Sequence, residues 1–250
     1  MSLIKGGLLD RRGFLKTTAA GALAASLPMG GAMAQTPKRG GHLRVAKGHG
    51  QTTDTLDPGQ WENGYMLALG FGIHGFLTQV AADGSLVPEL AESWEASDDA
   101  SVWRFKLRKG VTFHSGKPLT VEDVVASINH HRGEDSTSAA GPIVEPIQEI
   151  STEGDDTIVF TLSGGNADFP FILSDYHLAM CKAEGDSIDW RSGDGCGSYI
   201  LKSFKPGVSS TFERNPNHWR DDVAWVDSVE MLSIVDQNAR TSALVAGDVD

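Results

Sequence analysis

The sequence predicts a mixed α/β fold, in which helices pack against a mixed β-sheet. Residues 103–108 alternate apolar and charged side chains, which is the pattern of a strand with one buried face. Residues 121–128 place apolar side chains at positions i, i+3, i+4 and i+7, which indicates an amphipathic helix. Predicted strands and helices interleave along the chain, so the class is α/β or α+β. The predicted buried stripe of the helix consists of Val121, Val124, Val125 and Ile128.

The elements predicted between residues 40 and 94 follow from the alternation of apolar and polar residues and from turn-forming residues. Residues 40–46 alternate and predict a strand. Residues 52–63 are rich in turn formers, with a strong breaker at Asp57-Pro58-Gly59. We expect helices at residues 65–76 and, over a short stretch, at residues 88–94.

The helix predicted at residues 121–128 has a clear N-terminal signal. Thr120 can cap its backbone N–H groups, and the acidic pair Glu122 and Asp123 lies at the positive end of the helix dipole. Gly133 is expected to end it. Further strands are predicted at residues 157–162, 199–204, 209–214 and 229–235, and a last helix from Asp236 as cap to Gly247.

The N-terminus has the pattern of an export signal. Arg11 and Arg12 precede a mildly apolar Ala/Gly stretch at residues 17–27, and a small-residue cleavage site follows. The paired arginines favour the Tat route. We therefore expect residues 1–34 to be a Tat signal peptide, and the mature protein to begin near Gln35 in the periplasm.

Charge and composition exclude several classes of protein. The 250 residues carry 21 Lys and Arg against 33 Asp and Glu, a formal net charge of −12. Such an acidic surface repels phosphate backbones and anionic lipids, so neither nucleic-acid binding nor a peripheral membrane role is expected. Cys181 and Cys196 form either a disulfide, worth about 3 kcal/mol for a loop of roughly 15 residues, or two partly buried free thiols. No spacing of Cys or His suggests a zinc site.

Several motifs in a fixed order resemble one known family. They lie at residues 86–94, 103–114, 116–124, 214–219 and 243–250. In sequence and order they are similar to bacterial extracellular solute-binding protein family 5, the dipeptide/oligopeptide/nickel type of ABC-importer receptor. The resemblance covers essentially all of residues 38–250.

The resemblance implies a periplasmic binding protein type II-like lobe with the small extra domain of the peptide-binding family. On this basis residues 35–80 are the first part of lobe I, residues 81–183 the extra domain and residues 184–250 the second part of lobe I. Family members run to roughly twice this length. We therefore expect the second lobe to be missing, and a chain with half of the crevice to bind ligand weakly.

The resemblance also implies ligand-facing residues in three stretches. Two alternatives stay open: Trp61 could pack on the surface of a lobe, and the charged cluster after the Thr120 helix could simply be solvated. The candidate ligand-binding residues are Trp61, Glu62, Asn63, Tyr65, Arg132, Glu134, Asp135, Ser136, Asp175, Tyr176 and His177.

Other conspicuous side chains are expected to be structural. His130 and His131 are adjacent on a helix and point about 100° apart, so they cannot readily chelate one ion, and we expect a surface or capping role. His114 lies within the shared motifs and is expected to be structural. The tryptophans of these motifs, Trp94, Trp103 and Trp219, are expected in the core.

A family 5 receptor binds its solute by closure of two lobes and makes or breaks no bond. The resemblance thus implies a peptide or another small polar solute as ligand, an inner-membrane ABC permease complex as partner, the Tat translocase during export, and no cofactor or metal. The rival is a Tat-exported enzyme, against which stands the lack of GxGxxG, GxSxG, HExxH and P-loop motifs. A chaperone-like or signalling module on the same fold is a third hypothesis.

Overall fold

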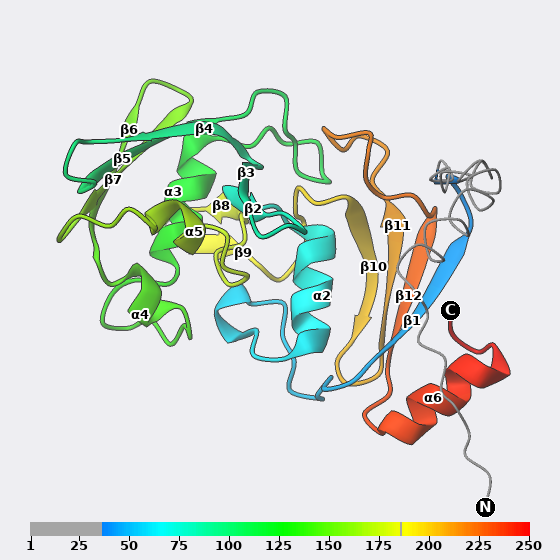
Figure 1. Ribbon diagram of the computed structural model, residues 1–250. Coiled ribbons are helices and arrows are strands. Elements are labelled where there is room, and N and C mark those ends of the chain that lie inside the picture. The colour runs from blue at the N-terminus through cyan, green and yellow to red at the C-terminus, as the bar shows by residue number, and fades with distance from the viewer. Residues whose placement is uncertain (1–36, 186) are drawn as a thin grey trace, which may run out of the picture. The chain divides into compact units, whose positions relative to one another are not determined.

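The computed structural model describes residues 37–185 and 187–250 (Figure 1). The predicted signal peptide at residues 1–34 lies outside the described residues. Residues 38–250 form one compact unit. Two four-stranded sheets, each with its own helices, make up most of this unit.

The first sheet is mixed, as the sequence predicts. Its strand order is β1-β12-β11-β10, with β1 parallel to β12 and the other neighbours antiparallel. All four lie where the sequence predicts strands, although β1 begins two residues late and β12 ends two residues early. The strands are β1 (His42–Lys47), β10 (Tyr199–Lys205), β11 (Ser209–Arg214) and β12 (Ser228–Ser233). The last helix, α6 (Gln237–Ala246), runs between Asp236 and Gly247 as predicted.

Helix α2 (Gly64–Ile73) packs against this sheet beside β10 (Figure 1). The hydroxyl of Tyr65 lies 2.8 Å from Ser210 Oγ and donates to the carbonyl of Met231 at 3.1 Å, which ties the helix to β11 and β12. Gly70 is required because a Cβ there would lie 2.3 Å from the ring of Trp61. The first core consists of Leu56, Trp61, Tyr65, Met66, Leu69, Ile73, Phe76, Ala179, Phe212 and Met231.

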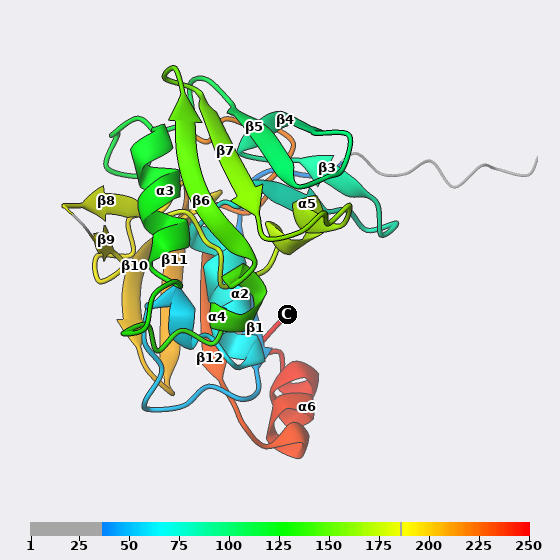
Figure 2. The same ribbon diagram turned by 90° about the vertical axis from the view of Figure 1, so that its left-hand side faces the viewer.

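The second sheet is antiparallel throughout, in the order β4-β5-β7-β6. Helix α3 (Val121–Asn129) lies beside it in Figure 2. Three phenylalanine rings form the centre of its core: Phe105 lies 5.7 Å from Phe160 and 6.2 Å from Phe169, between ring centroids. The strands are β4 (Ala91–Ala96), β5 (Val102–Leu107), β6 (Ile147–Glu153) and β7 (Thr157–Leu162).

The predicted helix at residues 88–94 is wrong. The chain there forms β3 (Leu86–Pro88), which pairs with β2 (Thr78–Val80), and then β4. Trp94 pairs with Phe105 across the strands, with the ring centroids 6.0 Å apart. Backbone pairing and aromatic packing across the strands outweigh the local helix preference.

Helix α3 begins as predicted, but its buried apolar stripe is narrower than the sequence predicts. The backbone N–H of Thr120 donates to Asp123 Oδ2 at 3.0 Å, one half of a capping box. Val121, Val124 and Ile128 are buried. Val125 is only half-buried, because it faces an open cavity. The predicted burial of Val125 is therefore wrong.

The remaining elements are short: η1 (Pro58–Gln60), α4 (Gly141–Val144), α5 (Phe169–Ile172), β8 (Lys182–Glu184) and β9 (Ser187–Asp189). Cys181 and Cys196 are fully buried free thiols, which decides between the two alternatives for this pair. Trp103 lies in the core, and Trp94 and Trp219 pack against it while partly exposed. The predicted division of the chain into lobe I and the extra domain, with boundaries at residues 81 and 184, stays a prediction.

Candidate functional site

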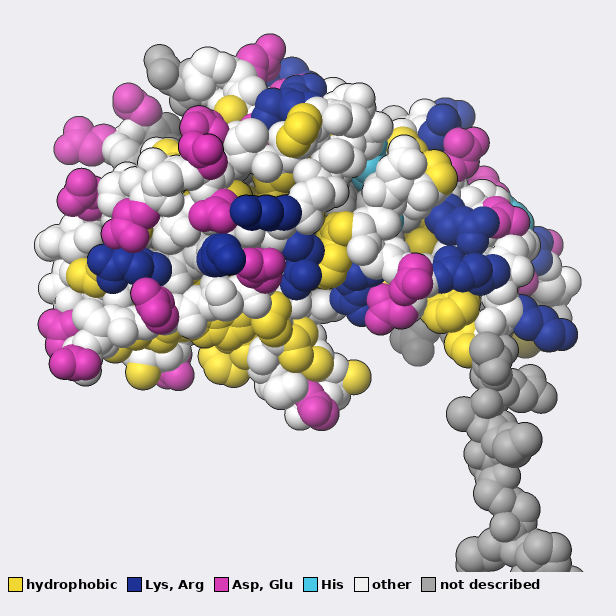
Figure 3. Space-filling model, turned by 90° about the horizontal axis from the view of Figure 1, so that it is seen from above, with side chains coloured by type: hydrophobic (Ala, Val, Ile, Leu, Met, Phe, Trp, Pro, Cys, Tyr) yellow, Lys and Arg dark blue, Asp and Glu magenta, His cyan; other side chains and the backbone are white. Residues whose placement is uncertain are grey.

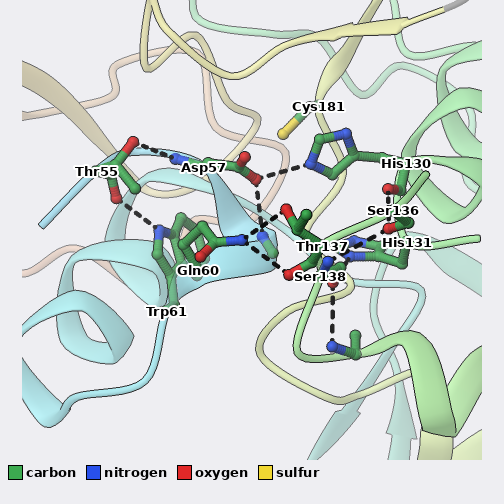
Figure 4. Close-up of polar contacts among 12 residues, drawn as sticks. Thr55, Asp57, Gln60, Trp61, His130, His131, Ser136, Thr137, Ser138 and Cys181 are labelled. Carbon is green, nitrogen blue, oxygen red and sulfur yellow. Dashed lines mark hydrogen bonds and ion pairs between the residues drawn. The ribbon is translucent and has the colours of Figure 1, made fainter.

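Three segments distant in the sequence lie together around the end of α3. They are residues 54–63, residues 130–140 and residues 174–178. Gln60 Nε2 donates to the carbonyl of Thr137 at 3.1 Å, within the first two of these segments (Figure 4). These segments carry all the sequence-predicted ligand-binding residues except Tyr65, which belongs to α2.

Asp57 and His130 hold the first two segments together. Asp57 Oδ1 accepts from the backbone N–H of Gly59 at 2.9 Å and lies 2.7 Å from His130 Nε2. Burial alone would raise the pKa of Asp57, but the hydrogen bond and charge of His130 and the N–H of Gly59 bring that pKa below its ordinary value. His130 is the C-cap of α3, which confirms its predicted capping role.

His131 is buried rather than on the surface, so the surface role expected for it is wrong. Only 1% of it is exposed, and its Nδ1 lies 2.6 Å from Ser138 Oγ (Figure 4). Burial, helped by the nearby His130 and His177, lowers the pKa of His131 to about 3. Its Nε2 has no hydrogen-bond partner within residues 37–185 and 187–250. The imidazole is therefore neutral at ordinary pH.

The third segment carries an acidic and aromatic surface. His177 is buried, and its Nδ1 lies 2.8 Å from Asp175 Oδ1, so it does not face a ligand directly as predicted. Asp175 and Tyr176 are half-buried. Burial, then the negative charges of Asp175 and Glu62, raise the pKa of Tyr176. Tyr176 therefore lies near two carboxylates from different segments.

Two of the residues predicted to face the ligand belong to the core instead. Trp61 and Tyr65 are both 0% exposed, and Trp61 Nε1 donates to the carbonyl of Thr55 at 3.1 Å. Tyr65 is buried because it bonds from α2 to the first sheet, and Trp61 is buried because its ring packs against Gly70 of α2. Asn63 caps α2 by accepting from the backbone N–H of Tyr65. Among the four candidate residues between positions 61 and 65, only Glu62 is exposed.

The residues predicted after α3 line two hollows that contain charged side chains. One, of about 790 Å³, is lined in part by Arg132, Glu134, Ser136 and Glu145. The other, of about 280 Å³, is lined in part by Arg132, Ser136 and Asp135. The Arg132 guanidinium donates to the carbonyl of Ile147 at 2.6 Å, which fixes its position between the hollows. Together they present one guanidinium among several carboxylates.

The two cysteines are buried and unreactive. Burial raises the pKa of Cys196 to about 12 and that of Cys181 still further, so neither thiol is an activated nucleophile. Across the part of the chain that the structure describes, no group of three or more His, Cys, Asp or Glu side chains is arranged to hold a metal ion. His114 Nε2 lies 3.0 Å from the carbonyl of Gly197, the structural role expected for it.

Sequence reasoning missed the residues that join the segments. Gln60, Thr137 and Ser138 make the contacts between and within the loops. Asp57 was read only as a turn former. The available signal was the pairing of an aspartate in a turn motif with a double histidine at a helix end, but only the fold shows that the two are adjacent.

Comparison with known proteins identifies the family. The model described as bacterial extracellular solute-binding proteins, family 5 Middle, matches residues 85–250. The chain belongs to this family. Among the curated relatives, Protein XP55 of Streptomyces lividans is 32% identical over 67% of this chain and 32% of its own length. Di/tripeptide-binding protein 1 of Pseudomonas aeruginosa is 29% identical over 77% of this chain and 41% of its own.

Solved structures show the same fold. The PBP AgaA of A. tumefacien R10, in complex with agropinic acid, superposes with a TM-score of 0.76 at 26% identity, covering 84% of this chain and 43% of that one. DppA of Helicobacter pylori, in complex with the peptide STSA, superposes with a TM-score of 0.74 at 24% identity, covering 85% of this chain and 46% of that one. The fold is thus that of type II periplasmic binding proteins, and the chain spans less than half the length of these relatives. Among the described helices, none has the length and apolar character needed to span a membrane.

Proposed function

We propose that this chain is part of a solute receptor of an ABC importer and binds a short peptide or another small polar solute without converting it. The observation that supports this proposal is the placement of Arg132 among Glu134, Asp135 and Glu145 in two adjoining hollows. Groups of both signs at one place complement the ammonium and carboxylate of a zwitterionic solute. Membership of family 5 supports the same function.

The proposed partner is an inner-membrane ABC permease complex, and the proposed location is the periplasm. Relatives are named as periplasmic proteins that bind oligopeptides or nickel, and others as di/tripeptide- or heme-binding proteins. Among these ligand classes we propose peptides, because the hollows combine opposite charges. The proposal includes no cofactor.

A titration of the whole chain with short peptides tests the binding proposal. Backbone NMR signals of Glu134, Asp135 and Ser136 should shift as Ala-Ala or Ala-Ala-Ala is added to about 10 mM, which reaches millimolar dissociation constants, near −4 kcal/mol. Arg132→Gln should weaken binding at least fivefold. The matched control is Arg104→Gln, which removes an exposed arginine paired with Glu153 on the second sheet and should leave the affinity unchanged. Absence of shifts, or conversion of the peptide to products, would overturn the proposal.

Export through the Tat route is a separate proposal, carried by Arg11 and Arg12. Replacing both with lysine should hold the precursor uncleaved in the cytoplasm, because that route depends on the arginine pair. Cell fractionation and immunoblotting measure the outcome, with Lys5→Arg as a control that should mature normally. Periplasmic maturation of the double-lysine variant would contradict the Tat route.

A further inference from the structure

Three histidines converge where the three segments of the candidate site meet. His130 and His131 belong to the second segment, residues 130–140, and their ring centroids lie 5.2 Å apart. His177 belongs to the third segment. Burial lowers the pKa of His131, and the charges of His130 and His177 lower it further, whereas Asp57 and Asp175 raise it in part. These five side chains form one electrostatic cluster, which we call the histidine junction.

Two imidazoles of the junction have a carboxylate partner from their surroundings. His130 Nε2 lies 2.7 Å from Asp57 Oδ1 (Figure 4), and His177 Nδ1 lies 2.8 Å from Asp175 Oδ1. Nε2 of His177 is unpaired among the described residues, but the charge of its ring is still offset by Asp175. A proton on either of these two rings is therefore matched by a negative charge.

His131 is the imidazole of the junction that has no carboxylate partner among the described residues. It is 1% exposed, its Nδ1 lies 2.6 Å from Ser138 Oγ, and its Nε2 is unpaired there. The other charged groups around it are Arg132, Glu134 and Glu145, which line the open hollow that His131 borders, where water screens them. A proton on His131 would thus create a buried cation beside two other imidazoles whose carboxylates are already engaged.

His131 is joined to the first segment through Ser138. A Cβ on Gly59 would lie 3.1 Å from the side chain of Ser138, so the two segments are in close contact at this point. Next to it, the backbone N–H of Ala139 donates to the carbonyl of Gly59 at 2.9 Å. The second segment therefore docks on the first at the residue whose side chain His131 holds.

Acid acts on this docking contact through His131. Its pKa is about 3 in the docked arrangement, against 6.5 for a histidine in water. Opening of the second segment exposes the ring to water, so below pH 6.5 the ratio of docked to open segment falls about tenfold per pH unit. Asp57 and Asp175 have lowered pKa values and lose their contribution only below about pH 4.

Groups outside the junction contribute little to the candidate site between pH 7 and pH 5. On the face shown in Figure 3, histidine is visible only in small spots, whereas Asp and Glu are scattered over it. Carboxyl groups in water titrate near 3.9 and 4.3, so most of them stay charged at pH 5. His74 and Glu89 have shifted pKa values, but both lie outside the three segments.

We propose that the histidine junction couples solute binding to pH: the second segment stays docked while His131 is uncharged, and a proton on His131 undocks it and releases the solute. This inference rests on the proposed function and deepens it, since it names a regulator of the same site. Only the docked chain presents Asp135 and Ser136 beside Arg132, and the apparent affinity scales with the docked fraction. Protons and solute therefore oppose each other's binding.

The affinity for Ala-Ala-Ala at two pH values tests the inference. The α-carboxyl and α-amino groups of this peptide titrate near 3.5 and 8, so its charges persist from pH 7 to pH 5. We expect at least threefold weaker binding at pH 5, measured from the backbone NMR signals of Glu134, Asp135 and Ser136. Without peptide, these signals should move toward random-coil positions at pH 5, whereas those of Phe105 and Phe160 in the second core stay native.

Two matched variants separate the junction from the stability of the whole chain. His131→Asn removes the titrating ring and keeps a polar atom near the position of Nδ1, facing Ser138. Its affinities at pH 7 and pH 5 should agree within about 1.5-fold, whatever its affinity at pH 7. The control is His74→Asn, because His74 is 2% exposed and burial lowers its pKa to about 4, but it lies outside the three segments. This variant should keep the threefold fall.

Each other result is decisive. Binding at pH 7 that is equally tight at pH 5 overturns the inference and leaves the proposed function standing. A fall that persists in His131→Asn, or that also disappears in His74→Asn, overturns it as well, because another group or global unfolding is then responsible. If His131→Asn does not fold, the unliganded chain decides: unmoved signals of residues 133–138 at pH 5 overturn the inference. If the peptide shifts no signal at pH 7, the proposed function and the inference both fail.

Discussion

Replacing Val124 with aspartate should lower the free energy of unfolding by at least about 4 kcal/mol, enough to leave much of the chain unfolded. Val124 is 0% exposed and packs in the second core with Val121 and Ile128. The variant loses the burial of the valine side chain, worth about 1.5–3 kcal/mol. It also places a carboxyl in the core without a hydrogen-bond partner, which adds several kcal/mol. Domains commonly have only 5–15 kcal/mol of stability.

The matched control is Val125→Asp on the same helix. Val125 is half-buried and faces an open hollow, so its aspartate stays in contact with water and should cost about 1 kcal/mol. Urea unfolding followed by circular dichroism measures both variants. Equal losses at the two positions would contradict the burial pattern of α3.

Acidification from pH 6.5 to pH 4 should destabilise the chain through two buried neutral histidines. Burial lowers the pKa of His131 to about 3 and that of His74 to about 4, from an ordinary value of 6.5. His74 is 2% exposed, and its Nδ1 lies 3.1 Å from the carbonyl of Met180. Between these values each histidine binds more protons in the unfolded chain than in the folded one, so its contribution to stability is full above pH 6.5 and falls as the pH falls. At about 1.4 kcal/mol per pH unit, each histidine removes roughly 3 kcal/mol by pH 4.

Two hydrogen-bonded carboxylates act in the same direction but at lower pH, whereas Glu89 acts in the opposite direction, because burial raises its pKa to about 8 from 4.5. Asp57 and Asp175 have pKa values below the ordinary 3.8, so their contribution is lost below about pH 4. Glu89→Gln removes the opposing carboxyl, so urea unfolding of this variant at pH 7, 5.5 and 4 reports on the histidines. In that background His131→Asn and His74→Asn should each reduce the loss of stability between pH 7 and pH 4 by about 3 kcal/mol, whatever their effect on stability at pH 7. An unchanged slope in both variants would show that these histidines do not titrate on unfolding.

The sequence by itself determined the elements whose signals are local. Alternation at β5, β7 and β11, the Thr120 cap of α3 and the caps of α6 each depend on residues within one or two turns or pleats of each other. The mixed sheet and the family also followed from the sequence, because the motifs keep their order and spacing. Local patterning is strong where a side chain's partner is a near neighbour in the chain.

The tertiary structure decided whatever depends on partners far along the chain. The chain at residues 91–96 forms a strand because Trp94 packs across from Phe105, and Val125 is only half-buried because it faces an open hollow. In the candidate site the sequence predicted the charged loop after α3 as one ligand-facing stretch. It also predicted that Trp61 and Tyr65 face the ligand, whereas both are buried in the first core. No spacing rule relates Asp57 to His130 or Gln60 to Thr137. These pairs arise only when separate segments pack, because burial and charge at each position are set by the neighbours that the fold supplies.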